Sequence, residues 1–274
     1  MNSLNLYTAP EIMQNYVELG KKKTLSPALK LLLLGVASGI MIGLGGVVVN
    51  TAVHAVDNPG LLRLIGGLIF PFGLGVVILT GMELFTGNCM IITSVLDKKA
   101  TLAGMLRNWF YVYLGNLAGG LMLSAGIVAS GQLDLNGGLL AAYTIKVAAF
   151  KCGLAFGPAL ILGIFCNLIV CLAVLCSLAA KDVAGRILGA YIPIAFFVIS
   201  GFEHSVANMY FIPAGILAML NPDYAAVAAA AGVDTAALSW SGFFISNLIP
   251  VTLGNIIGGA AIAVLLWVSH NKMK

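Results

Sequence analysis

Charged residues are scarce in this sequence. Only 9% of the 274 residues are Asp, Glu, Lys or Arg, and 60% are hydrophobic. An ordinary soluble domain has about 25% charged residues. So few charges cannot cover a surface exposed to water. The hydrophobic residues also come in long runs, most of which approach the roughly 20 residues that cross a bilayer as a helix. The composition therefore excludes an ordinary soluble protein and predicts an integral membrane protein.

Motifs for redox, metal, nucleotide or hydrolytic chemistry are also missing. The five cysteines have no C-x-x-C spacing. Cys166, Cys171 and Cys176 lie inside one hydrophobic run, where a thiol acts as a small apolar side chain. The sequence has no phosphate-binding P-loop motif and no G-x-S-x-G nucleophile motif. We therefore expect no metal site, no cofactor and no enzymatic activity, and an energy-consuming pump or a membrane hydrolase is unsupported.

The hydrophobic runs predict six transmembrane helices. They lie near residues 28–53, 64–95, 106–130, 153–180, 187–219 and 240–268. This divides the chain into an N-terminal segment (1–27), a six-helix membrane domain (28–268) and a C-terminal tail (269–274). The N-terminal segment is too polar for a cleaved secretory signal. Its residues 10–19 have the pattern of a short amphipathic helix that lies along the membrane, with Thr8 as a possible cap.

The distribution of basic residues predicts the orientation in the membrane. Cytoplasmic loops accumulate Lys and Arg. With both termini in the cytoplasm, all of the 14 basic residues except Arg63, Lys146 and Lys151 lie on the cytoplasmic side. The formal charge of +4 therefore reflects membrane topology, and no interleaved aromatic pattern indicates a nucleic-acid partner.

Two pairs of similar stretches indicate an inverted repeat. Residues 108–120 (NWFYVYLGNLAGG) and 247–259 (NLIPVTLGNIIGG) are identical at seven of thirteen positions. Residues 81–88 (GMELFTGN) and 201–208 (GFEHSVAN) share Gly, Glu and Asn in the same register. These pairs relate span 2 to span 5 and span 3 to span 6. Because each half holds three spans, the second half must enter the membrane in the opposite sense.

Spans 2 and 5 are too long, and too polar at their centres, to be continuous helices. Irregular backbone at membrane depth is tolerated where it is buried or lines a watery cavity, so two related breaks predict one central substrate path. Charged or ionisable residues within spans are costly and are functional candidates, which singles out Glu83, Glu203 and His204. We favour Glu83 and Glu203 as struts that bind backbone N–H groups at the broken helix ends over direct contact with a substrate.

His204 is favoured as a pore residue, because an imidazole exchanges protons near neutral pH. The alternative is a neutral histidine whose two nitrogens are both used in helix contacts, with Glu203 as its neighbour. Thr86, in the break of span 2, is the expected hydroxyl partner, ahead of Ser205. The two other histidines, His54 and His270, lie at span ends and are expected to be ordinary interface residues.

Four motifs, taken in order, resemble the formate/nitrite transporter family. They are LFTGN (84–88), NLIVCLAV (167–174), SGFEHSVANMYFIPAGI (200–216) and IPVTLGNIIGG (249–259), and the resemblance spans nearly the whole chain. It implies an all-α, aquaporin-like fold that assembles as a homopentamer, with one pore in each protomer, in the inner membrane of a prokaryote. It also implies transport of a small weak-acid anion, with formate first and nitrite or hydrosulfide as alternatives.

The resemblance also assigns pore residues. The polar pore candidates are the family's central histidine (His204), the threonine of span 2 (Thr86), the basic residue of the outer vestibule (Lys151) and two asparagines (Asn167 and Asn255). Glu203, the neighbour of the histidine, is added to this set. The apolar candidates match the family's constrictions and are Phe70, Leu74, Leu84 and Phe197. The chain departs from the family's formate channels at 87–89, directly after the threonine, which leaves the choice of anion open.

These residues predict a mechanism. A bare anion in an apolar constriction is destabilised by the order of several kcal/mol. We expect Lys151 to draw the anion inward and His204, polarised by Thr86 and held by Glu203, to supply a hydrogen bond or a proton. The neutralised species then passes the constrictions. Two alternatives stay open: a proton-coupled anion symporter, and a scaffold or receptor that would not need His204 for function.

Overall fold

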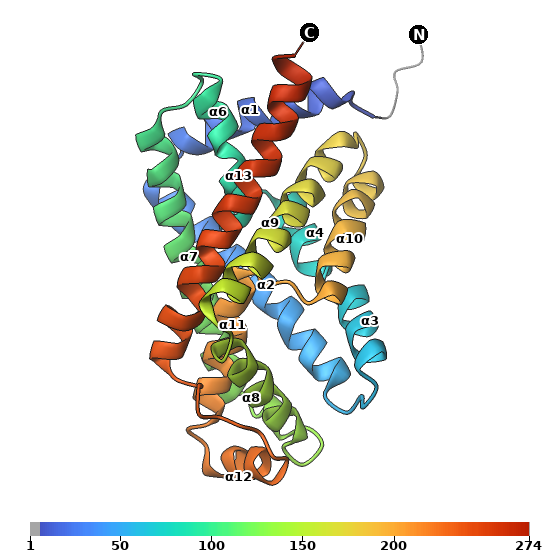
Figure 1. Ribbon diagram of the computed structural model, residues 1–274, viewed down its shortest axis with the longest axis vertical. Coiled ribbons are helices and arrows are strands. Elements are labelled where there is room, and N and C mark those ends of the chain that lie inside the picture. Colours follow the sequence, from blue (N-terminus) through green and yellow to red (C-terminus); the bar gives the residue numbers. More distant parts are fainter. Residues whose placement is uncertain (1–5, 274) are drawn as a thin grey trace.

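The structure is a computed structural model that describes residues 6–273. Six helical segments of this part are long and apolar enough to cross a membrane, which confirms the expected number. They are α2 (Ala28–Val53), α3 with α4 (Pro59–Ile69 and Phe72–Thr80), α7 (Leu102–Ala129), α9 (Phe156–Ala179), α10 (Val183–Ser200) and the π-helical turn η3 with α13 (Gly242–Leu248 and Ile249–Asn271). They form the elongated bundle of Figure 1.

Shorter helices complete the bundle. They are α1 (Ala9–Leu25), α5 (Phe85–Asn88), η1 (Cys89–Ile91), α6 (Ile92–Leu96), η2 (Gln132–Asp134), α8 (Leu139–Cys152), α11 (Ser205–Ala218) and α12 (Pro222–Ala230). The end of α13 lies beside α1 at one end of the molecule, and α12 lies at the other end (Figure 1). Neither α8 nor α12 was predicted, because neither is long enough to stand out as a membrane span.

Both predicted breaks are present. In span 2, α4 ends at Gly81, and in span 5, α10 ends at Gly201. The two glycines have φ angles of 70° and 73°, in the left-handed region that ends a helix and that glycine adopts without steric cost. Extended backbone follows in each case, and a second helix then begins at Phe85 or at Ser205. The breaks thus have the same backbone design.

The N-terminal helix is longer than predicted and packs on the protein itself. α1 begins after Thr8, the predicted cap, and the Glu11 carboxylate accepts hydrogen bonds from the N–H and the hydroxyl of Thr8 at 2.7 and 2.8 Å. Its apolar face buries Met13, Tyr16 and Val17 in a cluster with residues of α9 and α13. This face is therefore covered by protein and not by lipid.

The two halves of the chain repeat each other element by element. α1, α2, α3–α4, α5–α6 and α7 of the first half correspond to α8, α9, α10, α11 and α13 of the second. Glycines let the long helices of each half approach closely. A Cβ at Gly115 would lie 2.9 Å from the Cα of Gly35, and a Cβ at Gly254 would lie 3.0 Å from the Cα of Gly163. The two halves therefore repeat the same helix contact.

Candidate functional site

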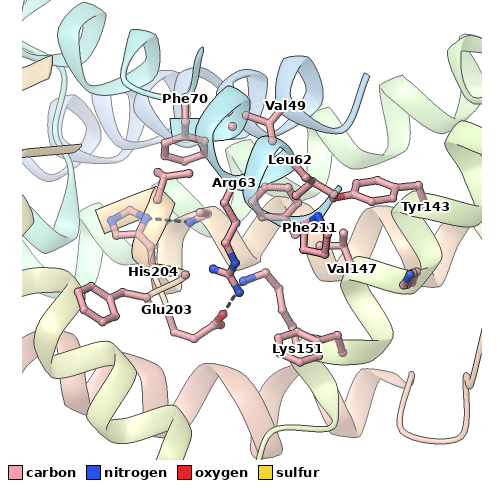
Figure 2. A pocket seen from close by; sticks show the side chains of 18 of the residues that line it. Val49, Leu62, Arg63, Phe70, Tyr143, Val147, Lys151, Glu203, His204 and Phe211 are labelled. Atoms are coloured by element: carbon pink, nitrogen blue, oxygen red, sulfur yellow. Dashed lines mark hydrogen bonds and ion pairs between the residues drawn. The ribbon is translucent and has the colours of Figure 1, made fainter. Parts of the chain in front are cut away.

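A cavity of about 590 Å³ lies between α3, α8 and the break of span 5 (Figure 2). Exposed residues of the α2–α3 loop, including Asp57, line its outer part, and His204 lies at its inner end. Most of the wall is apolar. The polar side chains that line it include three cations, which are Arg63, Lys146 and Lys151. These are the three basic residues that the sequence places on the outer side of the membrane.

His204 joins the two broken spans. It is the N-cap of α11 and is only 3% exposed. Its Nδ1 accepts a hydrogen bond from the Ala207 N–H at 3.1 Å, and its Nε2 lies 2.9 Å from the Thr86 hydroxyl. A neutral imidazole that accepts at Nδ1 carries its proton on Nε2, so Nε2–H donates to the Thr86 oxygen. The structure therefore brings together the two residues that were predicted to be partners.

The glutamates of the breaks bind side chains and not the backbone N–H groups that we expected. Glu203 Oε1 lies 2.7 Å from Lys151 Nζ, and Glu203 Oε2 accepts from the Asn208 amide at 2.7 Å. Among the described residues no hydrogen bond joins the Glu203 carboxylate to His204. The expectation that Glu203 holds the imidazole is therefore wrong, because the backbone of α11 holds it.

The first half contains the same arrangement. Glu83 Oε2 lies 2.8 Å from Lys23 Nζ and accepts from the Asn88 amide at 2.7 Å. Lys23 belongs to α1 and Lys151 to α8, so these two helices have equivalent roles. Both glutamates are almost fully buried, and a buried carboxylate needs such an ion pair and such hydrogen-bond donors to remain charged. Both glutamates thus connect a break to a neighbouring helix through side chains.

Two buried asparagines fasten the breaks to the long helices. Asn116 of α7 accepts from the Phe85 N–H at 3.0 Å and donates to the backbone carbonyl of the glutamate in the same break at 3.0 Å. Asn255 of α13 accepts from the Ser205 N–H at 2.9 Å and donates to the equivalent carbonyl at 3.0 Å. These bonds satisfy backbone groups that the broken helices leave free.

The two breaks differ in the side chains that meet between them. Leu84 is the N-cap of α5 and occupies the position that His204 occupies in α11. Two residues further, Thr86 in the first half corresponds to Val206 in the second. Each break thus contributes one polar and one apolar side chain at these two positions, and the imidazole and the hydroxyl meet.

The aromatic candidates lie beside the histidine. Phe70 and Phe197 are buried, their ring centroids are 5.8 Å apart, and their planes are nearly perpendicular at 84°. The Phe197 ring is 6.0 Å from the imidazole. Both phenylalanines line the cavity, whereas Leu74 and Leu84 lie buried in the surrounding apolar cluster and are not among its lining residues.

The asparagine candidates lie behind the site. Asn167 is completely buried and donates to the carbonyl of Thr86 at 3.0 Å and to that of Asn255 at 2.6 Å. Neither Asn167 nor Asn255 lines the cavity. Asn167 therefore positions the backbone of the residue that meets the histidine.

The sequence analysis missed several residues that line the cavity. His54 was expected to be an ordinary interface residue, but it lies in the cavity wall together with Tyr143 and Phe202. Arg63 and Lys146 were noted only as markers of topology. The sequence predicts that both lie on the same side of the membrane as Lys151, and this was a signal that could have placed them in one vestibule with it.

Comparison with known proteins identifies the family. The model of the formate/nitrite transporter family matches residues 10–269. The chain belongs to the formate/nitrite transporter family. It is therefore a membrane transport protein and not an enzyme, and the resemblance seen in the sequence motifs is confirmed.

Named members of the family are similar over most of their length. The probable formate transporter of Methanothermobacter thermautotrophicus is 38% identical over an alignment of 269 positions that covers 91% of this chain and 92% of that protein. The formate channel FocA of Haemophilus influenzae is 39% identical over 82% of this chain and 81% of its own. A solved pentameric formate channel with formate bound superposes with a TM-score of 0.80, at 34% identity, over 90% of this chain and 98% of that chain.

Proposed function

We propose that this chain is a channel for small monovalent weak-acid anions, with formate as its preferred substrate. The observation that carries the proposal is the hydrogen bond between His204 and Thr86, at the inner end of a cavity that contains cations. The protein would act as a homopentamer in the inner membrane of a prokaryote, with both termini in the cytoplasm. The names of the two relatives and the pentameric, formate-bound structural neighbour support this assignment.

The cavity lowers the energy of an entering anion. Lys151 lies in its wall, with one N–H bonded to Glu203 and the others available to an anion. The Lys151 ammonium also lies 5.5 Å from the centre of the Phe211 ring, which keeps its long side chain in place. Phe70 and Phe197 then narrow the path beside the imidazole, and water is excluded from this point inward.

His204 and Thr86 then neutralise the charge. Since Nε2–H of His204 donates to the Thr86 oxygen, the hydroxyl proton of Thr86 is free to donate to an anion. The proton that the anion gains comes from the water of the cavity: the Thr86 hydroxyl, polarised by His204 Nε2–H, holds the anion by a hydrogen bond while hydronium transfers a proton to its oxygen, and both side chains keep their own protons. Formate becomes formic acid, which crosses the apolar constriction without the cost of several kcal/mol that a bare anion would meet.

This mechanism selects conjugate bases of weak acids. Formate, nitrite and hydrosulfide are each the conjugate base of a weak acid and can accept a proton, whereas chloride, the conjugate base of a strong acid, cannot. Chloride would therefore have to pass the two phenylalanines as a bare ion. The distinction between formate, nitrite and hydrosulfide depends on their fit to the groups around His204.

The proposal is tested by uptake into proteoliposomes that contain the purified protein. Rates for formate, nitrite, hydrosulfide and chloride are measured with and without an imposed pH gradient, for the wild type, His204→Asn and Thr86→Val. We expect formate uptake that rises with an inward proton gradient in the wild type, and loss of this pH dependence in both variants. Wild-type vesicles that move none of the weak-acid anions, or a His204→Asn variant that behaves like the wild type, would contradict the proposal.

A further inference from the structure

The cations of the cavity differ in whether their charge is neutralised. Lys151 forms an ion pair with Glu203 at 2.7 Å, so that the two together carry no net charge. Arg63 lines the same cavity and, within residues 6–273, forms no ion pair. The field that attracts an anion into this cavity therefore comes more from Arg63 than from Lys151.

The Arg63 side chain is exposed and contacts the break of span 5. Its Nη1 donates to the carbonyl of Ile199 at 3.3 Å, near the C-terminus of α10, where the helix dipole favours a cation. The guanidinium lies directly over Gly201, so that a Cβ at that position would collide with it. It thus lies next to the backbone segment that leads to Glu203 and His204, and Figure 2 shows its side chain reaching from α3 into the cavity.

The chemistry of the side chain defines the ligand. A guanidinium has five N–H donors in a planar fork, and among the described residues only the bond to Ile199 uses one of them. The remaining donors match the two coplanar oxygens of a carboxylate, which an arginine binds through two parallel hydrogen bonds. Nitrite has the same two-oxygen shape. Hydrosulfide and chloride offer one atom and cannot use the fork.

We propose that Arg63 forms an anion-binding subsite at the outer side of the His204 site, which takes planar two-oxygen anions and favours them over single-atom anions. This inference rests on the proposed function, because it describes how the transported anion is captured. Lys146 lines the same cavity but offers only a mobile point charge without a planar fork. The shape preference therefore belongs to Arg63.

Two variants separate the contribution of the Arg63 charge to anion binding from that of its planar fork. Arg63→Gln keeps an amide N–H for the Ile199 carbonyl but removes the charge and the fork, and Arg63→Lys keeps only the charge. Initial rates of formate and hydrosulfide uptake are measured against concentration in proteoliposomes. We expect Arg63→Gln to raise the KM for formate about tenfold, the size expected for a lost hydrogen bond to a charged group, with a nearly unchanged maximal rate. Arg63→Lys should raise the KM for formate severalfold and that for hydrosulfide less than twofold.

Arg107→Gln is the matched control. Arg107 also donates from Nη1 to a backbone carbonyl, that of Ser26 at 3.0 Å, but it does not line the cavity. We expect its KM values to equal those of the wild type. The subsite is overturned if Arg63→Gln keeps the wild-type KM, if it lowers only the maximal rate, or if both anions respond equally to Arg63→Lys. Failure of the wild type to transport either anion would instead overturn the proposed function, and the subsite with it.

Discussion

The breaks of spans 2 and 5 have nearly the same scaffold but different central side chains. Each has a left-handed glycine, a buried glutamate paired with a lysine, and an asparagine that fastens the backbone. The N-cap that follows is Leu84 in one break and His204 in the other. The symmetric residues bind the backbone and the lysines around the breaks, and in the proposed mechanism the asymmetric pair of His204 and Thr86 supplies the chemistry.

The largest loss of stability is expected at the two buried glutamates, where the breaks are most alike. Glu83→Ala and Glu203→Ala each leave a lysine that is at least 84% buried without its counter-ion. Breaking a buried pair in this way costs about 3–5 kcal/mol. We expect both variants to unfold at clearly lower temperature and by similar amounts, as measured by thermal unfolding of the purified protein in detergent. If only one substitution destabilises the protein, the two pairs are not equivalent.

A smaller loss of stability, again similar in the two breaks, is expected when the asparagines that fasten them are replaced. Asn116→Ala and Asn255→Ala each remove an acceptor for one buried backbone N–H and a donor to one buried carbonyl. Each group left unsatisfied costs about 1–3 kcal/mol. Thermal unfolding should show a loss for both that is smaller than the loss at the glutamates. Asn15→Ala, an exposed position on α1, is the control and should leave the midpoint unchanged.

The sequence predicted most of this symmetric scaffold. The two matched motif pairs located the breaks, and the charged residues within them pointed to Glu83, Glu203 and His204. The partners of the glutamates could not be predicted, because Lys23 precedes Glu83 by 60 positions and Lys151 precedes Glu203 by 52. Only the fold brings these groups together.

The walls of the cavity were harder to predict than its centre. Phe70, Phe197, Thr86 and His204 were assigned from family motifs, and the structure places them close together. Arg63 was missed because its sequence context shows only a basic residue near a span end. Its role depends on the turn at Gly201, which is far away in the chain but directly beneath its guanidinium.

In the proposed mechanism one side chain, His204, separates the function of the two breaks, and the substitution His204→Leu tests this most directly. This change gives the break of span 5 the side chain that the break of span 2 carries at the equivalent position. Formate uptake and thermal unfolding are measured on the same preparation. We predict a folded protein whose uptake falls at least about 100-fold, since an uncompensated desolvation cost of about 3 kcal/mol corresponds to that factor. A folded variant that transports formate at the wild-type rate would contradict the claim.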